Sequence, residues 1–318
     1  MITYFVTAAH RYTMDIYLQS WGAALRPIIK VHNYGQLAEM EWLPGGTYIV
    51  SDLERLTHYQ RALAAEVWNQ LQAAAPNVRL LNHPTQVVLR AELLRTLHAT
   101  GRNEFNAYRV SETRTPGRFP VFLRRASDHE GSRTDLLSTQ GELDNIVLGA
   151  LCHGLNAQDL LIVEYRSAVD ADGIHHKFAA FNVGGQIIPR HLIFSRHWVL
   201  KMPDLIDAEK LASERDYLQT NPHEQVLRET FQLAHVDYGR CDYAVVNGRI
   251  QIWEINTNPI VMLPPEKYQP DHLPLQEPFA AQIREAFEAI NLEADPQLKI
   301  PLHLDRALID RVVTTTVG

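Results

Sequence analysis

The sequence predicts an α/β N-terminal unit followed by a larger α+β region with antiparallel sheets. Up to about residue 81, short β-branched or aromatic runs alternate with longer helical stretches, which is typical of a parallel sheet covered by helices. Beyond residue 84, strand-like runs dominate and single helices interrupt them, which favours antiparallel sheets. With 318 residues, 46% of them hydrophobic, the chain can bury a large core and form two or three compact units.

The first unit is expected to contain short strands separated by turn residues and helices. The strands are predicted at residues 2–6, 27–31, 47–51 and 78–81, and the helices at residues 14–21 and 57–74. In the second of these helices Leu63, Val67 and Leu71 recur every fourth residue and so form one apolar face. No glycine fingerprint follows the first strand, so the sequence does not indicate a dinucleotide site there.

A domain boundary is predicted near residue 84, where Asn82-His83-Pro84 ends the first unit. Thr85 is expected to cap a helix that runs to Leu97 and that Gly101 terminates. Later helices are expected at residues 141–153, 208–219, 223–234 and 277–290. Strands are expected at residues 119–125, 160–166, 177–183, 186–194, 243–246 and 249–255.

Composition excludes several classes of function. A formal net charge of -7 argues against a protein that binds the phosphate backbone of nucleic acids. Two separated cysteines, Cys152 and Cys241, are too few for a disulfide framework and fit a reducing compartment. The first residues do not resemble a signal peptide, and no stretch approaches the ~18 apolar residues of a membrane span. We therefore expect a cytoplasmic protein with neither a membrane nor a nucleic-acid partner.

The most informative segment is a predicted β-hairpin that carries acids at both ends, residues 241–259, with the sequence CDYAVVNGRIQIWEINTNP. Glu254 and Asn256 lie two residues apart and so share one face of a strand. The residues that alternate with them, Trp253 and Ile255, are expected to point into a core on the other face. Two polar side chains therefore converge on one side of this strand.

Asp242 can join this face only if the turn contains an odd number of residues. A two-residue Asn247-Gly248 turn would pair Asp242 with Trp253 and leave Glu254 on the opposite face. We therefore predict a three-residue loop in which Gly248 adopts a left-handed conformation.

Oxygen atoms of Asp242, Glu254 and Asn256 on one face would be hard ligands suited to Mg²⁺, which commonly bridges carboxylates to nucleotide phosphates. The alternative is a surface hairpin with solvated acids. Three features together favour the metal site and hence ATP: the initial Asp, the final Glu-x-Asn-x-x-Pro and the apolar approach Ile-Gln-Ile-Trp.

This segment resembles the metal-binding end of the ATP-grasp superfamily, and the resemblance extends over roughly residues 1 to 290. It implies an ATP-grasp fold in which two subdomains with antiparallel sheets enclose the nucleotide. The small α/β domain would comprise residues 1–84 and the ATP-grasp domain residues 85–318. Within the latter, residues 85–163 would form the first subdomain with a lid loop, and residues 164–318 the second subdomain with the metal-binding hairpin. The implied cofactors are ATP and Mg²⁺.

The resemblance also implies nucleotide-binding residues. Residues 119–124 resemble the strand that carries a phosphate-contacting cation, here Arg124 where the family more often has Lys, and a lid loop follows at residues 127–132. Residues 161–167 resemble the hinge that contacts adenine, which assigns Val163, Glu164 and Tyr165 to the nucleotide. Asp170 or Asp172 is expected to accept hydrogen bonds from the ribose, and Lys177 is expected to bind phosphate.

Arg190 occupies the place where relatives grip the substrate carboxylate or the transferred phosphoryl group, although a solvated basic face is the competing explanation. The resemblance thus implies an ATP- and Mg²⁺-dependent ligase that activates a carboxylate as an acyl phosphate and joins it to an amine or thiol. Arg124, Lys177 and Arg190 would oppose the developing charge. An ATP-grasp kinase and a non-catalytic ATP-binding scaffold are the alternatives. Residues 197–201 match no ligase subgroup, so the sequence does not identify the substrates.

Overall fold

The computed structural model of the protein describes every residue except 167–168, 170–171, 296 and 317–318. Its N-terminal unit is built on a parallel sheet with the strand order β2-β1-β4-β5. The strands are β1 (Ile2–Val6), β2 (Ile29–Asn33), β4 (Gly46–Val50) and β5 (Val78–Leu81), and the accompanying helices are α1 (Tyr12–Gln19), α2 (Tyr34–Ala38) and α3 (His58–Gln72). This arrangement confirms the predicted α/β unit.

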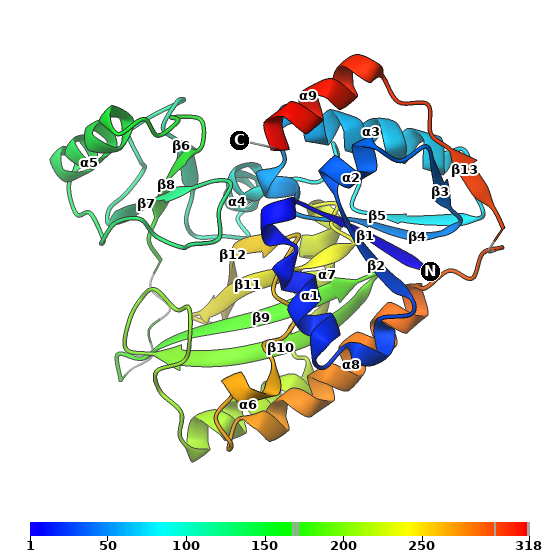
Figure 1. The fold of residues 1–318 in the computed structure, drawn as a ribbon. Helices are drawn as coiled ribbons and strands as arrows, with labels where there is room; N and C mark the ends of the chain where they lie inside the picture. The colour runs from blue at the N-terminus through cyan, green and yellow to red at the C-terminus, as the bar shows by residue number, and fades with distance from the viewer. Residues whose placement is uncertain (167–168, 170–171, 296, 317–318) are drawn as a thin grey trace.

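Two antiparallel sheets follow, as predicted (Figure 1). The smaller has the order β6-β8-β7, from β6 (Ala107–Arg109), β7 (Val121–Arg125) and β8 (Leu160–Glu164), and it projects from the rest of the molecule together with α5 (Gln140–Cys152). The larger has the order β10-β9-β11-β12, from β9 (His175–Val183), β10 (Gln186–Ser195), β11 (Tyr238–Val246) and β12 (Arg249–Asn256). Its helices are α6 (Ala208–Thr220), α7 (Glu224–Leu233) and α8 (Gln276–Ile290).

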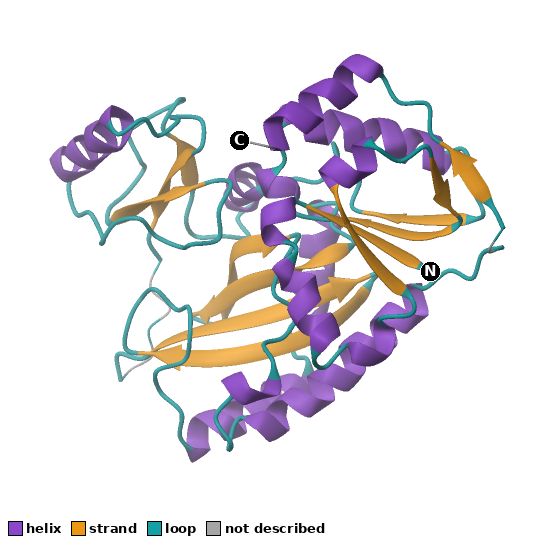
Figure 2. Cartoon of the chain, viewed as in Figure 1, coloured by secondary structure: helices purple, strands orange, loops and turns teal. Residues whose placement is uncertain are grey.

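The C-terminal tail returns to the N-terminal unit, which the sequence patterns did not predict. Strand β13 (Lys299–Pro301) pairs with β3 (Trp42–Pro44), and α9 (Arg306–Thr316) lies over α2 and α3 (Figures 1 and 2). Among the described residues five single-turn helices complete the elements: η1 (Ala8–His10), η2 (Ala23–Leu25), η3 (Leu53–Arg55), η4 (Pro265–Lys267) and η5 (Leu273–Leu275). None of the helices within the described chain is long and apolar enough to cross a membrane.

Helix α4 (Arg90–Ala99) begins later than predicted, and its N-cap residue is Leu89 instead of Thr85. A turn at His83, whose carbonyl oxygen accepts the amide protons of Gln86 and Val87, occupies the expected first helical turn. Val88 N–H then donates to the carbonyl oxygen of Ala234, so tertiary contacts replace the local helix signal.

The hairpin of β11 and β12 corrects the predicted three-residue loop. Asn247 and Gly248, with φ of 51° and 74°, form a two-residue turn that pairs Val246 with Arg249. Gly248 is left-handed as predicted, but the extra residue lies further along β12. Tyr243 pairs with Ile252 and Asp242 pairs with Glu254, so the strand bulges at Trp253. This bulge, and not the turn, brings Asp242 and Glu254 to one face.

Continuous apolar packing joins the N-terminal unit to the larger antiparallel sheet. Helix α8 contributes Phe279 and Phe287 to the same cluster as Tyr4 of β1 and Phe181 of β9. The rings of Tyr4 and Tyr238 also pack edge to face, with centroids 5.5 Å apart. The parallel sheet therefore packs directly against β11 of the larger antiparallel sheet.

Asn82, at the predicted domain boundary, adds hydrogen bonds to this apolar contact between the two units. The residue is fully buried with φ of 67°, and its side-chain amide donates to the carbonyl oxygens of Val50 and Tyr238 at 3.2 and 2.8 Å. Its Oδ1 accepts the amide protons of Asp237 and Tyr238 at 2.8 and 2.9 Å. One side chain thus satisfies four backbone groups across two units.

Replacing Asn82 with Ala leaves these backbone groups buried without partners. It also places in the left-handed conformation a residue that adopts it less readily than Asn does. We expect the free energy of unfolding to fall by about 3 to 5 kcal/mol, measured by urea denaturation. Asn77→Ala is the control, because Asn77 is exposed and donates only a 3.4 Å side-chain hydrogen bond to Ala74. Equal stability of the Asn82→Ala and Asn77→Ala variants would contradict the bridging role of Asn82.

Candidate functional site

A cavity of about 540 Å³ is lined by residues from both antiparallel sheets and from the segment that follows β10. Most of the predicted site residues line this cavity. Those that line it are Arg124 of β7, Val163 and Glu164 of β8, the following Tyr165, Lys177 of β9, Arg190 of β10, Asp242 of β11 and Glu254 of β12. Asn256 and Asp172 are not among its lining residues, and Asp170 lies outside the described residues.

One row of side chains crosses all four strands of the larger sheet below this cavity. His191 pairs with Ala179, Ala179 pairs with Asp242, and Asp242 pairs with Glu254. Directly paired residues share a face, so these side chains point to the same side of the sheet. The small Ala179 separates the imidazole of His191 from the two carboxylates. Arg190 is the extra residue of a second bulge, because Pro189 pairs with Ala180 and His191 with Ala179.

The Asp242 carboxylate is held by two cations. Lys177 Nζ lies 3.1 Å from Oδ2, and Arg240 donates to the two oxygens from Nε at 2.7 Å and from its terminal nitrogen at 3.2 Å. Burial alone would raise the pKa of Asp242, but the charges of Arg240 and Lys177 outweigh burial and lower it. Asp242 is therefore ionised at neutral pH.

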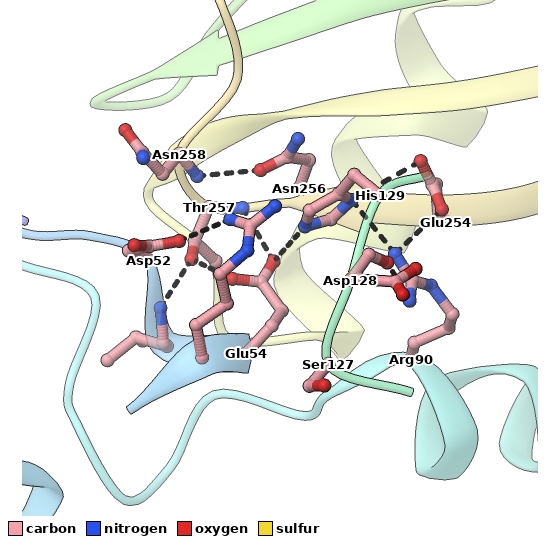
Figure 3. A network of polar contacts seen from close by, with 12 residues as sticks. Asp52, Glu54, Arg90, Ser127, Asp128, His129, Glu254, Asn256, Thr257 and Asn258 are labelled. Carbon is pink, nitrogen blue, oxygen red and sulfur yellow. Dashed lines mark hydrogen bonds and ion pairs between the residues drawn. The ribbon is translucent and has the colours of Figure 1, made fainter. Parts of the chain in front are cut away.

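The neighbouring Glu254 binds two arginines, Arg90 and Arg124, each with a terminal nitrogen 2.8 Å from Oε2. His129 Nδ1 lies 3.5 Å from the other oxygen, Oε1. Burial opposes ionisation, yet the two guanidinium groups hold the pKa of Glu254 well below its ordinary value. His129 also reaches toward the first unit, with Nε2 3.8 Å from Glu54, and Figure 3 shows it between these two acids.

Arg90, the first residue of α4, fixes the loop that carries His129. Its side chain is fully buried and donates to the carbonyl oxygens of Arg125, Ala126 and Asp128 at 3.1, 2.7 and 2.7 Å. A second guanidinium nitrogen lies 2.9 Å from His129 Nδ1. The predicted lid loop is therefore tied to α4 and to Glu254 in this structure (Figure 3).

Asn256, the third predicted metal ligand, shares the face of Glu254 and pairs with Arg240. Its Oδ1 accepts the amide proton of Asn258 at 2.8 Å (Figure 3). An amide oxygen has a second lone pair, so this bond leaves one acceptor position. Among the described residues no group of three or more His, Cys, Asp or Glu side chains is arranged to bind a metal ion. The candidate donor set is thus two carboxylates and one amide oxygen.

The side of the cavity formed by the end of β8, the predicted hinge, is lined mainly by apolar side chains. The carboxylate of Glu164 on this side already has hydrogen-bond partners. Glu164 is buried, and its carboxylate accepts the amide proton of Asn106 at 3.0 Å and the hydroxyl proton of Tyr108 at 2.9 Å. Tyr165 N–H donates to Pro120 at 2.9 Å. The Trp198 ring lies 5.2 and 5.5 Å from the rings of Phe122 and Tyr165. An aromatic group of the post-β10 segment therefore closes this side.

Arg190 is buried in the cavity wall and has only uncharged hydrogen-bond partners in the described part of the chain. Its guanidinium donates to the carbonyl oxygen of Val261, to Gln276 Oε1 and to the Tyr268 hydroxyl at 3.2, 2.8 and 2.8 Å. It also lies 4.6 Å above the centre of the Phe279 ring. Three of its five N–H groups are used, which leaves two for a ligand. No carboxylate compensates this charge within the described residues.

Sequence reasoning missed several side chains of this site. Arg240 lies two residues before Asp242, so strand alternation could have placed it on the same face. Arg90 and Trp198 come from a helix start and an irregular segment, and no local pattern could have indicated their partners. Trp253 was expected in a core, but the bulge turns it toward the cavity that it lines.

The carboxyl edge of the N-terminal sheet reaches this network through η3. Glu54 accepts from the backbone and the hydroxyl group of Thr257 at 2.7 and 2.6 Å, just after β12. Asp52 is buried in a left-handed conformation with φ of 60° and binds Thr7, Arg55 and His10, whose Nδ1 lies 3.2 Å from Oδ2. Burial raises the pKa of Asp52, but His10, Arg55 and Thr7 lower it to about 2.

Because its folded-state pKa is depressed, Asp52 stabilises the fold above pH ~4, and this contribution is lost as the pH falls toward 2. The shift corresponds to about 2.5 kcal/mol. We expect Asp52→Asn to lower the free energy of unfolding by about that amount at pH 7, and the difference from the wild type to vanish near pH 2, in urea titrations across this range. Asp144→Asn, on the exposed face of α5, is expected to give no such pH-dependent difference. A constant difference for Asp52→Asn across the range would contradict this ionisation.

No protein-family model matches the sequence, and no curated protein matches it. Solved structures do match. The D-alanine–D-alanine ligase from Bacillus anthracis complexed with ATP is 12% identical, covers 89% of this chain and 98% of its own, and has a TM-score of 0.49. The ATP-grasp ligase PsnB complexed with minimal precursor is 12% identical, covers 81% of this chain and 90% of its own, and has a TM-score of 0.49. The macrocyclase MdnC bound with precursor peptide MdnA from Microcystis aeruginosa MRC is 13% identical, covers 89% of this chain and 99% of its own, and has a TM-score of 0.46. These matches to ligase structures cover 81 to 89% of this chain, at 12 to 13% identity and with TM-scores below 0.5.

Proposed function

We propose that the protein is an ATP-dependent ligase that activates a carboxylate as an acyl phosphate and joins it to an amine or thiol. The observation that carries this proposal is the charge on the cavity floor. Two carboxylates, Asp242 and Glu254, contact four basic side chains: Lys177, Arg240, Arg90 and Arg124. Arg190 adds a cation without an acidic partner among the described residues. Such an excess of buried positive charge favours a polyanionic ligand such as a triphosphate.

The two sides of the cavity suit the two ends of ATP. Phe122, Val163 and Tyr165 offer apolar and aromatic surface for the adenine, and Arg124 and Lys177 would bind the phosphates. Glu164 would lie beside the adenine and hold the hinge through Asn106 and Tyr108. For the ribose we propose Asp172, in the turn that precedes β9, or Asp170, which lies outside the described residues. The nucleotide would then extend along the cavity from β8 to β12.

Mg²⁺ would be held by Asp242, Glu254 and Asn256. The donor set fits this ion, because all three offer hard oxygen atoms on one face of two paired strands. When bound, the ion neutralises phosphate charge. The proposal requires the carboxylates to exchange partners: Arg124 and Lys177, now paired with Glu254 and Asp242, would turn to the phosphates.

The chemistry needs no protein nucleophile, since phosphoryl transfer to a carboxylate depends on positioning and on charge stabilisation. Lys177 and Arg190 are the proposed catalytic cations. Arg190 is preorganised by Val261, Gln276 and Tyr268, so its two remaining N–H groups have a fixed direction. It would hold the acyl phosphate oxygen atoms while the acceptor attacks.

Glu254→Gln tests the nucleotide site by thermal denaturation. We expect the melting temperature of the wild type to rise by about 5 °C with Mg²⁺ and ATP at ~100 times the Kd, and to rise less with either alone. The Gln variant keeps the shape of the side chain but loses the charge, so its shift should no longer depend on Mg²⁺. Glu92→Gln, outside the cavity, should behave as the wild type. A wild-type protein without any shift would exclude the nucleotide site.

Product analysis tests the reaction. We expect phosphate release from ATP to depend on a carboxylate and an amine or thiol, with a new amide or thioester detected by mass spectrometry. Glu254→Gln should lower this turnover at least ~100-fold because a charge-stabilising group is lost. A phosphorylated acceptor would instead identify a kinase, and binding without turnover would identify a scaffold.

A further inference from the structure

The end of the cavity that lies beyond Arg190 contains a buried histidine and carboxylate pair. His272 lines the cavity, and its Nε2 lies 2.8 Å from Oε2 of Glu214. The two residues are 8% and 3% exposed. Glu214 comes from α6, on which only Glu214 and Tyr217 are buried. A buried carboxylate on such a surface helix costs free energy, which only a specific partner offsets.

The geometry of this pair fixes the tautomer of His272. A carboxylate can only accept a hydrogen bond, so the 2.8 Å contact assigns the proton to Nε2, which donates it to Glu214. The Gln276 amide nitrogen, 3.3 Å from the same Nε2, is then a packing neighbour and not a hydrogen-bond partner. Nδ1 then has its lone pair free, and no side chain or backbone group in the described chain bonds to it. Glu214 Oε1 is also buried without a partner, so the carboxylate acts on His272 alone. An imidazole oriented in this way is suited to accept a proton.

His272 is connected to the proposed reaction centre. Gln276 Nε2 lies 3.3 Å from His272 Nε2, and Gln276 Oε1 accepts from Arg190 at 2.8 Å. One residue thus separates His272 from the cation that would hold the acyl phosphate.

We propose that His272, oriented by Glu214, is the general base of the second half-reaction, an assignment that rests on the proposed ligase function. The acceptor is an amine. Its nitrogen forms a bond to the acyl carbon, and the carbon–oxygen bond to phosphate breaks with the electron pair leaving on phosphate. The proton of the attacking nitrogen passes to His272 Nδ1. Glu214 is a positioning residue, since it acts on His272 and does not touch the reacting atoms.

Hydroxylamine separates the two half-reactions because it is unprotonated at neutral pH and traps acyl phosphates as hydroxamates without a general base. The protein is incubated with Mg²⁺, ATP and a mixture of the common amino acids, with or without hydroxylamine. We expect His272→Asn and His272→Ala to form hydroxamate at the wild-type rate and amide at least ~100-fold more slowly. Added imidazole should partly restore amide formation in His272→Ala.

His223→Asn is the matched control, because His223 is a half-buried histidine that binds the Tyr243 hydroxyl at 2.9 Å and does not line the cavity. It should form both products normally. Equal loss, or equal retention, of hydroxamate and amide in His272→Asn would overturn the assignment. A wild-type protein that forms no hydroxamate would instead overturn the ligase function itself.

The tautomer provides a test that needs no substrate. We expect nitrogen-15 spectra of the whole protein to show the proton of His272 on Nε2, and Glu214→Gln to disturb that tautomer while the control signals of His223 are unchanged. A proton on Nδ1 in the wild type would overturn the role of His272 whatever the substrate.

Discussion

The position of Glu254 opposite Asp242 depends on a single extra residue in β12. The turn at Asn247 and Gly248 is as tight as a hairpin allows, so uninterrupted pairing would place Trp253 opposite Asp242. Glu254 would then point to the other face, where Cys241 and Ile255 are packed in the core. The bulge at Trp253 avoids this, because it restores the alternation of the apolar residues on one face and of the acids on the other.

The second bulge has the same effect on the opposite edge of the sheet. The extra residue Arg190 lies beside His191, in the row that leads to Asp242 and Glu254. Lys177 and Arg240 lie in the adjacent rows, two residues from Ala179 and Asp242 along their strands, so cations flank the carboxylates on this face. Each carboxylate binds at least two cationic side chains, which keeps both acids ionised in spite of burial. The excess of cations is what a bound anion would compensate, and buried charge of this kind is costly without one.

The sequence predicts the parts of this arrangement that local patterns encode. Alternation identified the strands and placed Glu254 and Asn256 on one face, and the requirement that Asp242 join them was correct. The predicted three-residue loop was wrong, because Asn-Gly favours a two-residue turn and the bulge at Trp253 has no local sequence signature. Arg90 lies far from Glu254 in the sequence, and the tail that contains β13 and α9 returns to the first unit by tertiary packing alone. Single-sequence patterns carry no information on such contacts.

The two arginines that bind Glu254 are not equivalent. Arg90 is fully buried and makes three hydrogen bonds to carbonyl oxygens in addition to its ion pair, so it would remain in place if Glu254 turned to another partner. Arg124 lines the cavity, and apart from Glu254 its side chain has, among the described residues, only a 3.4 Å hydrogen bond to the carbonyl oxygen of Asp128. Its burial is nearly as complete, but its bonds are fewer and easier to exchange. The anchor of the loop and the cation that is able to meet an incoming anion are therefore different residues, which allows a ligand to draw Arg124 away while Arg90 keeps the loop on α4.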